Sequence, residues 1–320
     1  MRVLFVTSTR IGDAVLSTGL LNHLGKTIPE AQITVAVGYL PAPLFTQFPA
    51  VKRIIPLRKH RFGLHWSKLW ISTFGSVWDI VIDLRGSALG WLLLSKQRKI
   101  ICKPLPNEHR VETLARMMNL SSPPSPVLPT GSLPKRIAKK HIGGKTTIGL
   151  GVTANWPPKI WPADRFISLA ENIIGVNGPF HGARLAVFGG PGEEDIARPV
   201  LDALGPSAAN FVGNFDICAT AALIEKCGLF IGNDSGLMHM AAALNVPTIG
   251  LFGPSPPEQY APWGENCRAI SGDVSYRELV NNPTFDHQRN INLMTGLSAK
   301  KVLSAVTALA NDISKNRLLS

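Results

Sequence analysis

The sequence predicts an α/β protein made of two Rossmann-like domains that face each other across a cleft. Strand-like and helix-like segments alternate along both halves of the 320-residue chain, which is the pattern of doubly wound sheets. The clearest strand-like segments are apolar without alternation, as in parallel strands that are buried on both faces. A chain of this length is long for a single core, so two domains are expected.

The first half is expected to form one sheet with its connecting helices. Apolar runs and helical periodicity predict strands at Arg2–Thr7, Gln32–Val37, Val51–Leu57 and Trp78–Leu84, and helices at Ala14–Leu24 and Glu108–Leu120. Residues 121–133 are rich in Pro and Ser, a composition typical of an extended linker. We place the boundary within or just after this stretch and take residues 1–140 as the first domain.

The second half is expected to form a second domain over residues 141–297, followed by a terminal helix within residues 298–320. The same patterns predict strands at Thr146–Val152, Arg184–Phe188, Gly228–Gly232 and Thr248–Phe252, and helices at Ala163–Ile174, Leu237–Leu244 and Ser298–Ile313. Residues 228–254 alone make a complete β-α-β unit, because a turn with helix N-cap chemistry separates the first strand from the helix.

Composition and charge limit the class of protein and its partners. No apolar run reaches about 18 residues, the first residues lack the pattern of a secretory signal, and the four cysteines form no close pair, so a cytoplasmic protein is expected. Residues 1–145 hold 21 Lys and Arg against 6 Asp and Glu, whereas residues 146–320 hold 12 against 15. The net positive charge of the first half therefore predicts an anionic partner, such as acidic lipid, a phosphorylated glycolipid or nucleic acid.

The turn Asp234-Ser235-Gly236 is the strongest candidate for a ligand site. It lies between an apolar strand and a helix, where ligands of parallel sheets bind against helix N-termini. Free backbone N–H groups and the positive end of the helix dipole favour an anion there, most often a phosphate.

The stretch DSGLMHMAAALNVPTIGLFGPSPPEQYAPWG, residues 234–264, resembles the nucleotide-sugar signature of glycosyltransferase family 9, which contains the lipopolysaccharide heptosyltransferases. The resemblance implies the GT-B fold, with the terminal helix packing back on the first domain. It also implies an inverting, metal-independent transferase without a cofactor. The implied donor is ADP-heptose, and the implied acceptor is a lipopolysaccharide inner core or a related anionic glycan.

Two catalytic residues follow from the resemblance. The pair Gly12-Asp13 matches a Gly-Asp turn whose aspartate is the general base, and a carboxylate after the first strand suits that role. Asp13 is equally suited to cap a helix, and the two roles are compatible. Residues 159–162, Lys-Ile-Trp-Pro, match the Lys-x-Trp-Pro motif, so Lys159 is expected to stabilise the departing diphosphate.

The donor is expected to contact a larger set of residues. A glutamate after the glycine loop 189–192 is expected to hold the ribose, with Glu193 preferred over Glu194. Residues 154–158 depart from the hydroxyl-rich pattern of the family, although Asn155 keeps a hydrogen-bonding side chain. The full expected set is Gly12, Asn155, Glu193, Asp234, Ser235, Gly236, Leu237 and His239.

The basic and aromatic run 58–70 has two interpretations. In one, Arg58 and Arg61 bind a phosphorylated glycolipid acceptor, and the run lies at the cytoplasmic face of the inner membrane. In the other, the run is a solvated surface with Trp66 and Trp70 packed into the core.

Other classes of function fit the sequence less well. A nicotinamide-dependent oxidoreductase needs a GxGxxG turn after the first strand, and TSTRIGD has one glycine. A module that binds nucleic acid or anionic lipid explains the basic half but leaves the anion site of the second half unexplained. A transferase for another nucleotide sugar, or an epimerase of the same fold, remains open because the choice of base rests on few loop contacts.

Overall fold

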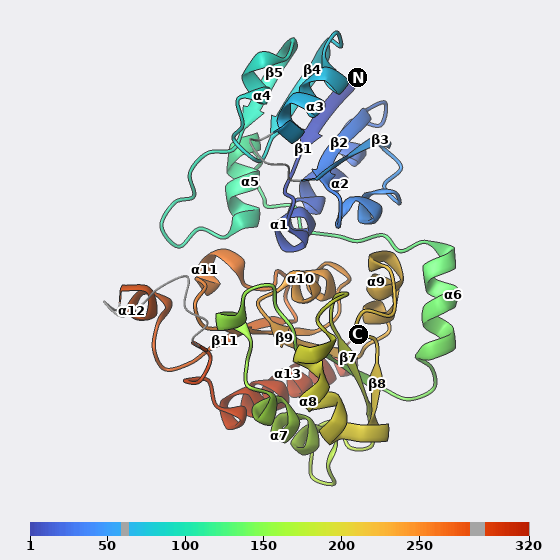
Figure 1. The fold of residues 1–320 in the computed structure, drawn as a ribbon, viewed down its shortest axis with the longest axis vertical. Helices are drawn as coiled ribbons and strands as arrows, with labels where there is room; N and C mark the ends of the chain where they lie inside the picture. The colour runs from blue at the N-terminus through green and yellow to red at the C-terminus, as the bar shows by residue number, and fades with distance from the viewer. Residues whose placement is uncertain (59–63, 282–291, 320) are drawn as a thin grey trace. The chain divides into compact units, whose positions relative to one another are not determined.

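The computed structural model describes residues 1–58, 64–281 and 292–319, and the chain divides into two compact units at Gly131/Ser132 (Figure 1). Each unit is an α/β sandwich around its own parallel sheet, as the sequence predicts. The division falls before the expected boundary at residue 140, because helix α6 (Ser132–His141) packs against α9 (Ile217–Glu225) of the second unit. The preceding Pro-rich stretch contains neither helix nor strand and lies on the first unit, where the Val127 N–H donates to Thr18 Oγ1 at 3.0 Å.

The first unit has a five-stranded sheet in the order β3-β2-β1-β4-β5, with every pair parallel. Its strands are β1 (Arg2–Val6), β2 (Gln32–Gly38), β3 (Val51–Leu57), β4 (Trp78–Asp83) and β5 (Ser95–Ile100). Its helices are α1 (Ile11–Leu16), α2 (Thr18–Thr27), η1 (Ala42–Phe45), α3 (Leu64–Thr73), α4 (Leu89–Leu92) and α5 (Arg110–Met118). The parallel register brings the carboxyl ends of all five strands to one edge of the sheet.

Two local departures from the sequence prediction have clear causes. The single helix expected at Ala14–Leu24 is divided at Ser17, whose hydroxyl donates to the Ala14 carbonyl at 2.7 Å and so competes with the helix backbone. Strand β5 was not expected, because its sequence SKQRKI is basic rather than apolar. Lysine and arginine are the residues that protect a sheet edge from further pairing, and β5 is an edge strand.

The second unit has a six-stranded parallel sheet in the order β11-β10-β9-β6-β7-β8. Its strands are β6 (Thr147–Gly151), β7 (Arg184–Phe188), β8 (Ala208–Asn210), β9 (Leu229–Asn233), β10 (Thr248–Phe252) and β11 (Cys267–Ser271). Its remaining helices are η3 (Pro157–Lys159), α7 (Ala163–Ile174), α8 (Glu194–Leu204), η4 (Gly205–Ser207), α10 (Gly236–Ala243), α11 (Pro257–Tyr260), α12 (Tyr276–Asn281) and α13 (Ala299–Leu319).

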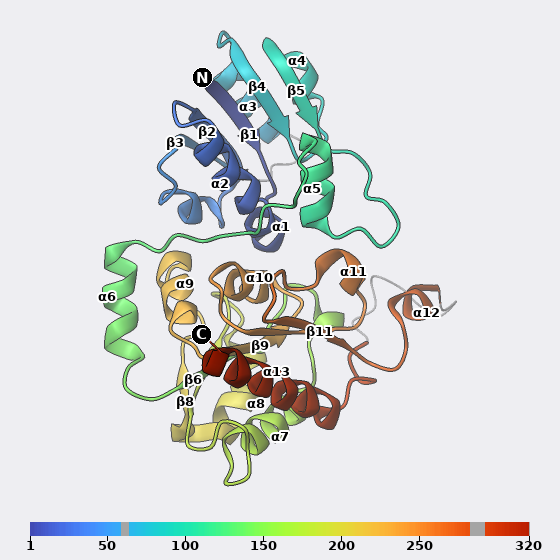
Figure 2. The same cartoon turned by 180° about the vertical axis from the view of Figure 1, so that it is seen from behind.

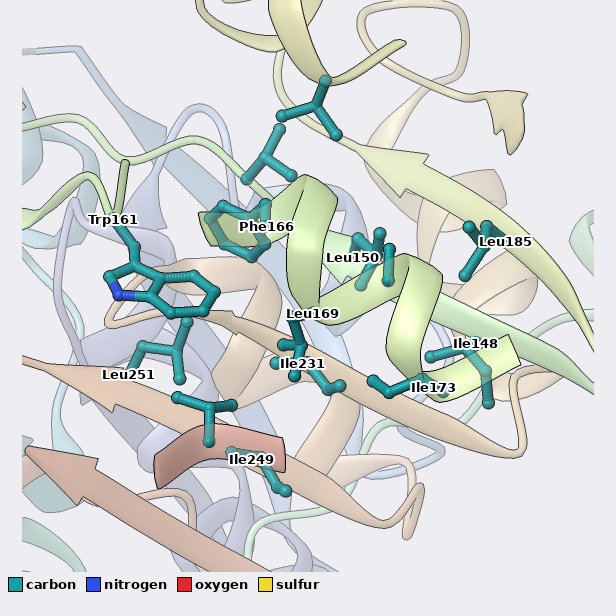
Figure 3. Packing of buried hydrophobic residues seen from close by; sticks show 14 of the residues in the cluster. Ile148, Leu150, Trp161, Phe166, Leu169, Ile173, Leu185, Ile231, Ile249 and Leu251 are labelled. Carbon is teal, nitrogen blue, oxygen red and sulfur yellow. The ribbon is translucent and has the colours of Figure 1, made fainter. Parts of the chain in front are cut away.

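The core of the second unit packs α7 and α13 against one face of the sheet. Figure 3 shows Phe166, Leu169 and Ile173 of α7 over Leu150 and Ile231 of the central strands. Helix α13 adds Val302, Val306 and Leu309 to the same cluster (Figure 2). The terminal helix therefore buries an apolar face within the second unit, and the expected reach of residues 298–320 to the first domain stays a prediction.

Among the described residues, no helix is long and apolar enough to cross a membrane.

Candidate functional site

Asn233, the last residue of β9, ties together the loops at the carboxyl edge of the second sheet. Its side chain is fully buried, and both ends of the amide are used. Oδ1 accepts a hydrogen bond from the Trp161 N–H at 3.0 Å, and Nδ2 donates to the Val152 carbonyl at 3.0 Å. The loop after β6 and the loop before α7 are thus fixed to the end of β9, next to the predicted anion site.

Asp234 holds a lysine and a serine from two other loops. Its Oδ2 accepts hydrogen bonds from Lys159 Nζ and from Ser255 Oγ, each at 2.6 Å. The Asp234 side chain is 8% exposed and that of Lys159 is 22% exposed, so the ion pair lies mostly below the surface. Hydrogen bonds to a partly buried carboxylate are strong, and these two fix the direction of the lysine side chain.

Helix α10 begins at Gly236, two residues after Asp234. Ser235 is its N-cap residue by backbone conformation, with φ −147° and ψ 172°, but its hydroxyl caps no backbone N–H. Ser235 Oγ is buried and has no hydrogen-bond partner in the part of the chain that the structure describes. The first N–H groups of a helix lack partners within the helix, so the start of α10 presents donors, a positive dipole end and an unused hydroxyl at one place.

Gly250 allows α10 to lie directly on the sheet. A Cβ atom at this position of β10 would lie 2.4 Å from Met238 Sδ and 2.8 Å from Phe252 Cε2. A side chain there would force α10 away from β10. The glycine therefore sets the height of the helix and of its N-terminus above the sheet.

His239 lies behind the Asp234 carboxylate. The residue is 5% exposed, and its Nε2 is 3.8 Å from Asp234 Oδ1, which is too long for a hydrogen bond. The structure therefore places His239 in the packed layer beneath Asp234. Its expected contact with the donor stays a prediction.

The loop after β7 presents two glutamates at the same edge. Glu193 Oε2 accepts from the Gly190 N–H at 2.6 Å, which closes the glycine loop on itself. Glu194 Oε1 accepts from the Gly192 N–H at 3.2 Å, and this residue is exposed. A ribose hydroxyl would have to share or displace the bond between Glu193 and Gly190.

The unusual loop 154–158 shapes the approach of Lys159. Pro157 and Pro158 begin the short turn η3, and the Lys159 N–H donates to the Trp156 carbonyl at 2.9 Å. This turn directs Lys159 back toward Asp234. Asn155 is exposed in the same loop, where its amide is accessible to a ligand.

In the first unit, Asp13 lies in the first turn of α1, after the central strand. Ser8 Oγ donates to Asp13 Oδ2 at 3.3 Å, and it accepts from the Arg10 N–H at 3.1 Å. Arg85 Nη1, from the loop after β4, reaches the same Ser8 oxygen at 3.4 Å. Ser8 therefore links the carboxylate to a cation on the neighbouring strand. Gly12 precedes Asp13 in the helix and is partly exposed.

Arg85 is positioned by a buried carboxylate. Asp83 is fully buried at the end of β4, and it accepts from the Arg85 N–H at 2.8 Å and from the Ser87 N–H and hydroxyl, each at 2.7 Å. These bonds fold the loop tightly. The Arg85 side chain remains exposed beside Ser8.

Arg58 adds a second cation to this edge of the first sheet. It follows β3 and its guanidinium lies over the ring of Tyr39, 3.9 Å from the centroid, in a cation–π contact. Arg61 lies outside the described residues. Trp66 and Trp70 are half-buried and pack against the apolar cluster of the first unit, as the second interpretation of this run expects.

Comparison with known proteins shows the family to which this chain belongs. Residues 75–288 match the model of glycosyltransferase family 9 (heptosyltransferase). The chain belongs to glycosyltransferase family 9. It is 24% identical to lipopolysaccharide heptosyltransferase 2 of Salmonella typhimurium, with 98% of this chain and 99% of the relative covered.

Two solved structures share the fold of this family 9 transferase. The glycosyl transferase family 9 protein from Veillonella parvula matches with a TM-score of 0.80 at 21% identity, covering 97% of each chain. The Escherichia coli heptosyltransferase WaaC with ADP matches with a TM-score of 0.71 at 18% identity, covering 97% of this chain and 100% of that chain. The fold is therefore GT-B, as the resemblance implies, and the protein is a glycosyltransferase.

The structure of this family 9 member adds residues that the sequence did not single out. Asn233 fixes the loops that flank Lys159, Ser255 contacts Asp234, and Ser8 contacts Asp13. Each is a polar residue at the end of an apolar strand or shortly after it, and that position was the available signal. Sequence alone does not say which of these polar groups turn toward the same point.

Proposed function

We propose that this transferase moves heptose from ADP-heptose to a lipopolysaccharide inner core or a related anionic glycan, with inversion at the anomeric carbon and without a metal ion. The observation that carries the proposal is the Lys159–Asp234–Ser255 group at the start of α10. The names of the relatives support the sugar and the acceptor class, and the ADP bound to one structural neighbour supports the nucleotide.

In this scheme, the second unit stabilises the leaving group. As the bond between the anomeric carbon and the diphosphate breaks, negative charge grows on the phosphate oxygens. Lys159 has three N–H donors, of which one is given to Asp234, so the others are available to a phosphate. The N–H groups at the start of α10 and the Ser235 hydroxyl supply further donors.

The first unit supplies the base. An acceptor hydroxyl attacks the anomeric carbon from the face opposite the diphosphate, and Asp13 takes its proton, so ADP departs as the new glycosidic bond forms. Ser8 donates to this carboxylate, and Arg85 in turn donates to Ser8. Arg58 and Arg85 are exposed cations suited to acceptor phosphates.

Charge neutralisation is assigned to protein groups in this proposal. Within residues 1–58, 64–281 and 292–319, no group of three or more His, Cys, Asp or Glu side chains is arranged to hold a metal ion. Lys159 and the dipole of α10 are therefore proposed to take the role that a divalent cation has in other diphosphate chemistry.

The test is a transfer assay with ADP-heptose and a purified inner-core acceptor, with and without EDTA. We expect transfer that EDTA leaves unchanged and a product of inverted anomeric configuration by NMR. Transfer from UDP- or GDP-sugars but not from ADP-heptose would refute the donor. A loss of activity in EDTA that magnesium restores would refute the metal-free scheme, and retention of configuration would refute direct displacement.

We further propose that the enzyme works at the cytoplasmic face of the inner membrane, because the proposed acceptor is a membrane glycolipid. The first unit, residues 1–131, carries 16 Lys and Arg against 6 Asp and Glu, which favours an anionic surface.

A further inference from the structure

Helices α3 and α4 of the first unit, and the short segments that follow them, expose several large apolar side chains. Six such residues are between 54% and 70% exposed, and we refer to them together as the α3–α4 patch: Ile71, Phe74, Val77, Trp91, Leu92 and Leu94. Single exposed apolar residues are ordinary on soluble proteins, but a contiguous group indicates a surface that contacts a partner.

The patch residues belong to one face of the unit. Leu69 of α3 and Leu89 and Leu93 beside α4 share one buried cluster with strands β1 and β4, so both helices cover the same side of the sheet (Figures 1 and 2). The Trp78 N–H donates to the Leu94 carbonyl at 3.0 Å, which brings Val77 next to Leu94. Val77 and Leu94, which are 17 positions apart in sequence, are therefore neighbours in space.

The core does not account for the composition of this face. In the segment Gly90-Trp91-Leu92-Leu93-Leu94, Leu93 is the buried apolar side chain, while Trp91, Leu92 and Leu94 are exposed. A helix on a soluble protein normally carries polar residues on its outer face. The outward apolar residues cost solubility and contribute little to folding, so they require another explanation.

Cations surround the patch. Arg98 of β5 donates to the Gly90 carbonyl at 3.1 Å and to the Leu93 carbonyl at 2.7 Å, at the end of α4. Arg53 of β3 donates to the Ser72 carbonyl at 3.2 Å, at the end of α3. Lys68 is exposed on α3 itself.

Acidic groups are nearly absent from the same region. Residues 64–100 contain two acidic residues, Asp79 and Asp83. Asp83 is fully buried, and Asp79 is paired with Lys96 at 2.7 Å. The face is thus an apolar centre with a net positive border.

We propose that the α3–α4 patch is a docking surface for an anionic phospholipid bilayer, into which Trp91 and Leu92 insert at the level of the head groups. Tryptophan favours the interface between head groups and acyl chains, and basic side chains around it gain from anionic lipid. A second copy of the chain is a poorer occupant, because a two-fold contact would place the cations of one patch against those of the other.

This surface lies on the unit that carries Asp13. Strand β4 has six residues, so the sheet spans about 20 Å from edge to edge along its strands. Val77 and Leu94 directly precede β4 and β5, so this part of the patch lies at the amino ends of the strands, on the same unit as the carboxyl edge that carries Asp13. The purpose of the docking rests on the proposed function, whereas the binding itself does not.

The experiment is cosedimentation of the full chain with vesicles of phosphatidylglycerol and phosphatidylcholine, and with vesicles of phosphatidylcholine alone. The test variant is Trp91→Glu with Leu92→Glu. The matched control is Val176→Glu with Val274→Glu, which makes the same change of charge at exposed apolar positions of the second unit. We expect the test variant to bind anionic vesicles at least roughly tenfold more weakly, since each buried large apolar side chain contributes more than a tenfold change in affinity requires.

A second measurement distinguishes insertion from electrostatic adsorption. Brominated lipids quench tryptophan fluorescence only at contact, so part of the quenching should disappear in Trp91→Phe. The melting temperature and the activity on a delipidated acceptor should be unchanged in the test variant, which separates lost docking from lost folding.

Three outcomes would overturn the proposal. They are absence of wild-type binding to anionic vesicles, equal binding by test and control variants, and a dimer that the test substitutions convert to monomer without any loss of vesicle binding. Failure of heptosyl transfer alongside patch-dependent vesicle binding would refute the proposed function and leave the docking surface standing.

Discussion

Lys159 Nζ and Asp234 Oδ2 are 2.6 Å apart, and they join a loop after β6 to the turn that begins α10. The carboxylate also accepts the Ser255 hydroxyl, so one buried acidic group sets the direction of two donors. An ammonium held in this way needs no reorganisation when charge develops on a nearby phosphate. We therefore interpret Asp234 as a positioning group and Lys159 as the group that contacts the diphosphate.

Substitution at this pair should separate the two roles. Lys159→Met should lower kcat by about 10²-fold, the typical loss when one donor to a developing charge is removed. Asp234→Asn keeps a hydrogen-bond acceptor for Lys159 and should lower kcat less. Steady-state kinetics with saturating donor would measure both, and an unchanged kcat in Lys159→Met would exclude the lysine from leaving-group stabilisation.

Ser235 and Ser255 allow a matched comparison. Ser235 Oγ is buried without a partner among the described residues, so Ser235→Ala should leave thermal stability unchanged or slightly higher. The same change should weaken ADP binding about fivefold to tenfold, the value of one hydrogen bond of ~1 kcal/mol. Ser255→Ala should instead lower stability, because it removes a donor from the Asp234 carboxylate. Calorimetric titration would measure the ADP affinity of both variants, and thermal unfolding would measure their stability. Equal ADP affinity in Ser235→Ala and wild type would show that the Ser235 hydroxyl does not contact ADP.

The sequence was sufficient for the fold, and the location of the donor site stays a prediction. The apolar strands at residues 32–38 and 248–252 and the turn at Asp234 are local features, and parallel topology then places their ends at one edge. Strand β5 was missed because an exposed edge strand does not need apolar residues. The sequence does not show where residues 132–140 pack, because α9, the partner of helix α6, lies far along the chain.

The hydrogen-bond partners of individual side chains could not be predicted from the sequence. Ser235 stands at an N-cap position, yet its hydroxyl does not cap the helix. Glu193 was expected to face a ribose, and it bonds to the N–H of Gly190. Both outcomes depend on the exact distances between groups within one loop or turn. Residue type and spacing do not determine those distances.

Asp13 gives a direct test of the proposed base. Asp13→Asn should reduce kcat by about 10²- to 10⁴-fold, the usual contribution of general-base catalysis, while donor affinity stays unchanged. Ser8→Ala, which removes the hydroxyl that donates to Asp13, should cause a smaller loss of kcat. Transfer rates and ADP titrations would be compared. If Asp13→Asn kept near wild-type turnover, the carboxylate would not be the general base, and its role would be limited to the start of helix α1.

Substitution of Gly250 tests whether the close packing of α10 on the sheet contributes to stability. A Cβ at this position would lie 2.4 Å from Met238 Sδ, so Gly250→Ala should destabilise the second unit by about 1–3 kcal/mol, the usual cost of overpacking. Gly250→Ala combined with Met238→Ala should recover part of that loss, because the clashing side chain is removed. Urea unfolding would give the free energies. A single variant as stable as wild type would show that the helix moves freely on the sheet.

Glu108 should make the first unit sensitive to acid. Its carboxylate accepts from Arg116 Nε at 2.6 Å and Nη2 at 2.8 Å, and from the Leu105 N–H at 2.8 Å. The bond from the Arg116 guanidinium is the main cause that lowers the pKa of Glu108 to about 2. Because this pKa lies below the value of ~4.3 in an unfolded chain, the stabilisation is complete above about pH 5.

As the pH falls from about 5 to 2, the unfolded chain binds a proton before the folded one does, and the stabilisation is lost. Glu108→Gln should therefore lower the free energy of unfolding at pH 7 by about 1.5–3 kcal/mol, the value of hydrogen bonds to charged groups. It should also flatten the dependence on pH, so the wild-type and variant curves converge toward pH 2. Urea midpoints measured from pH 7 to pH 2 would show this convergence. Parallel curves across that range would mean that Glu108 titrates alike in the folded and unfolded chains, and the pair with Arg116 would then contribute nothing to acid stability.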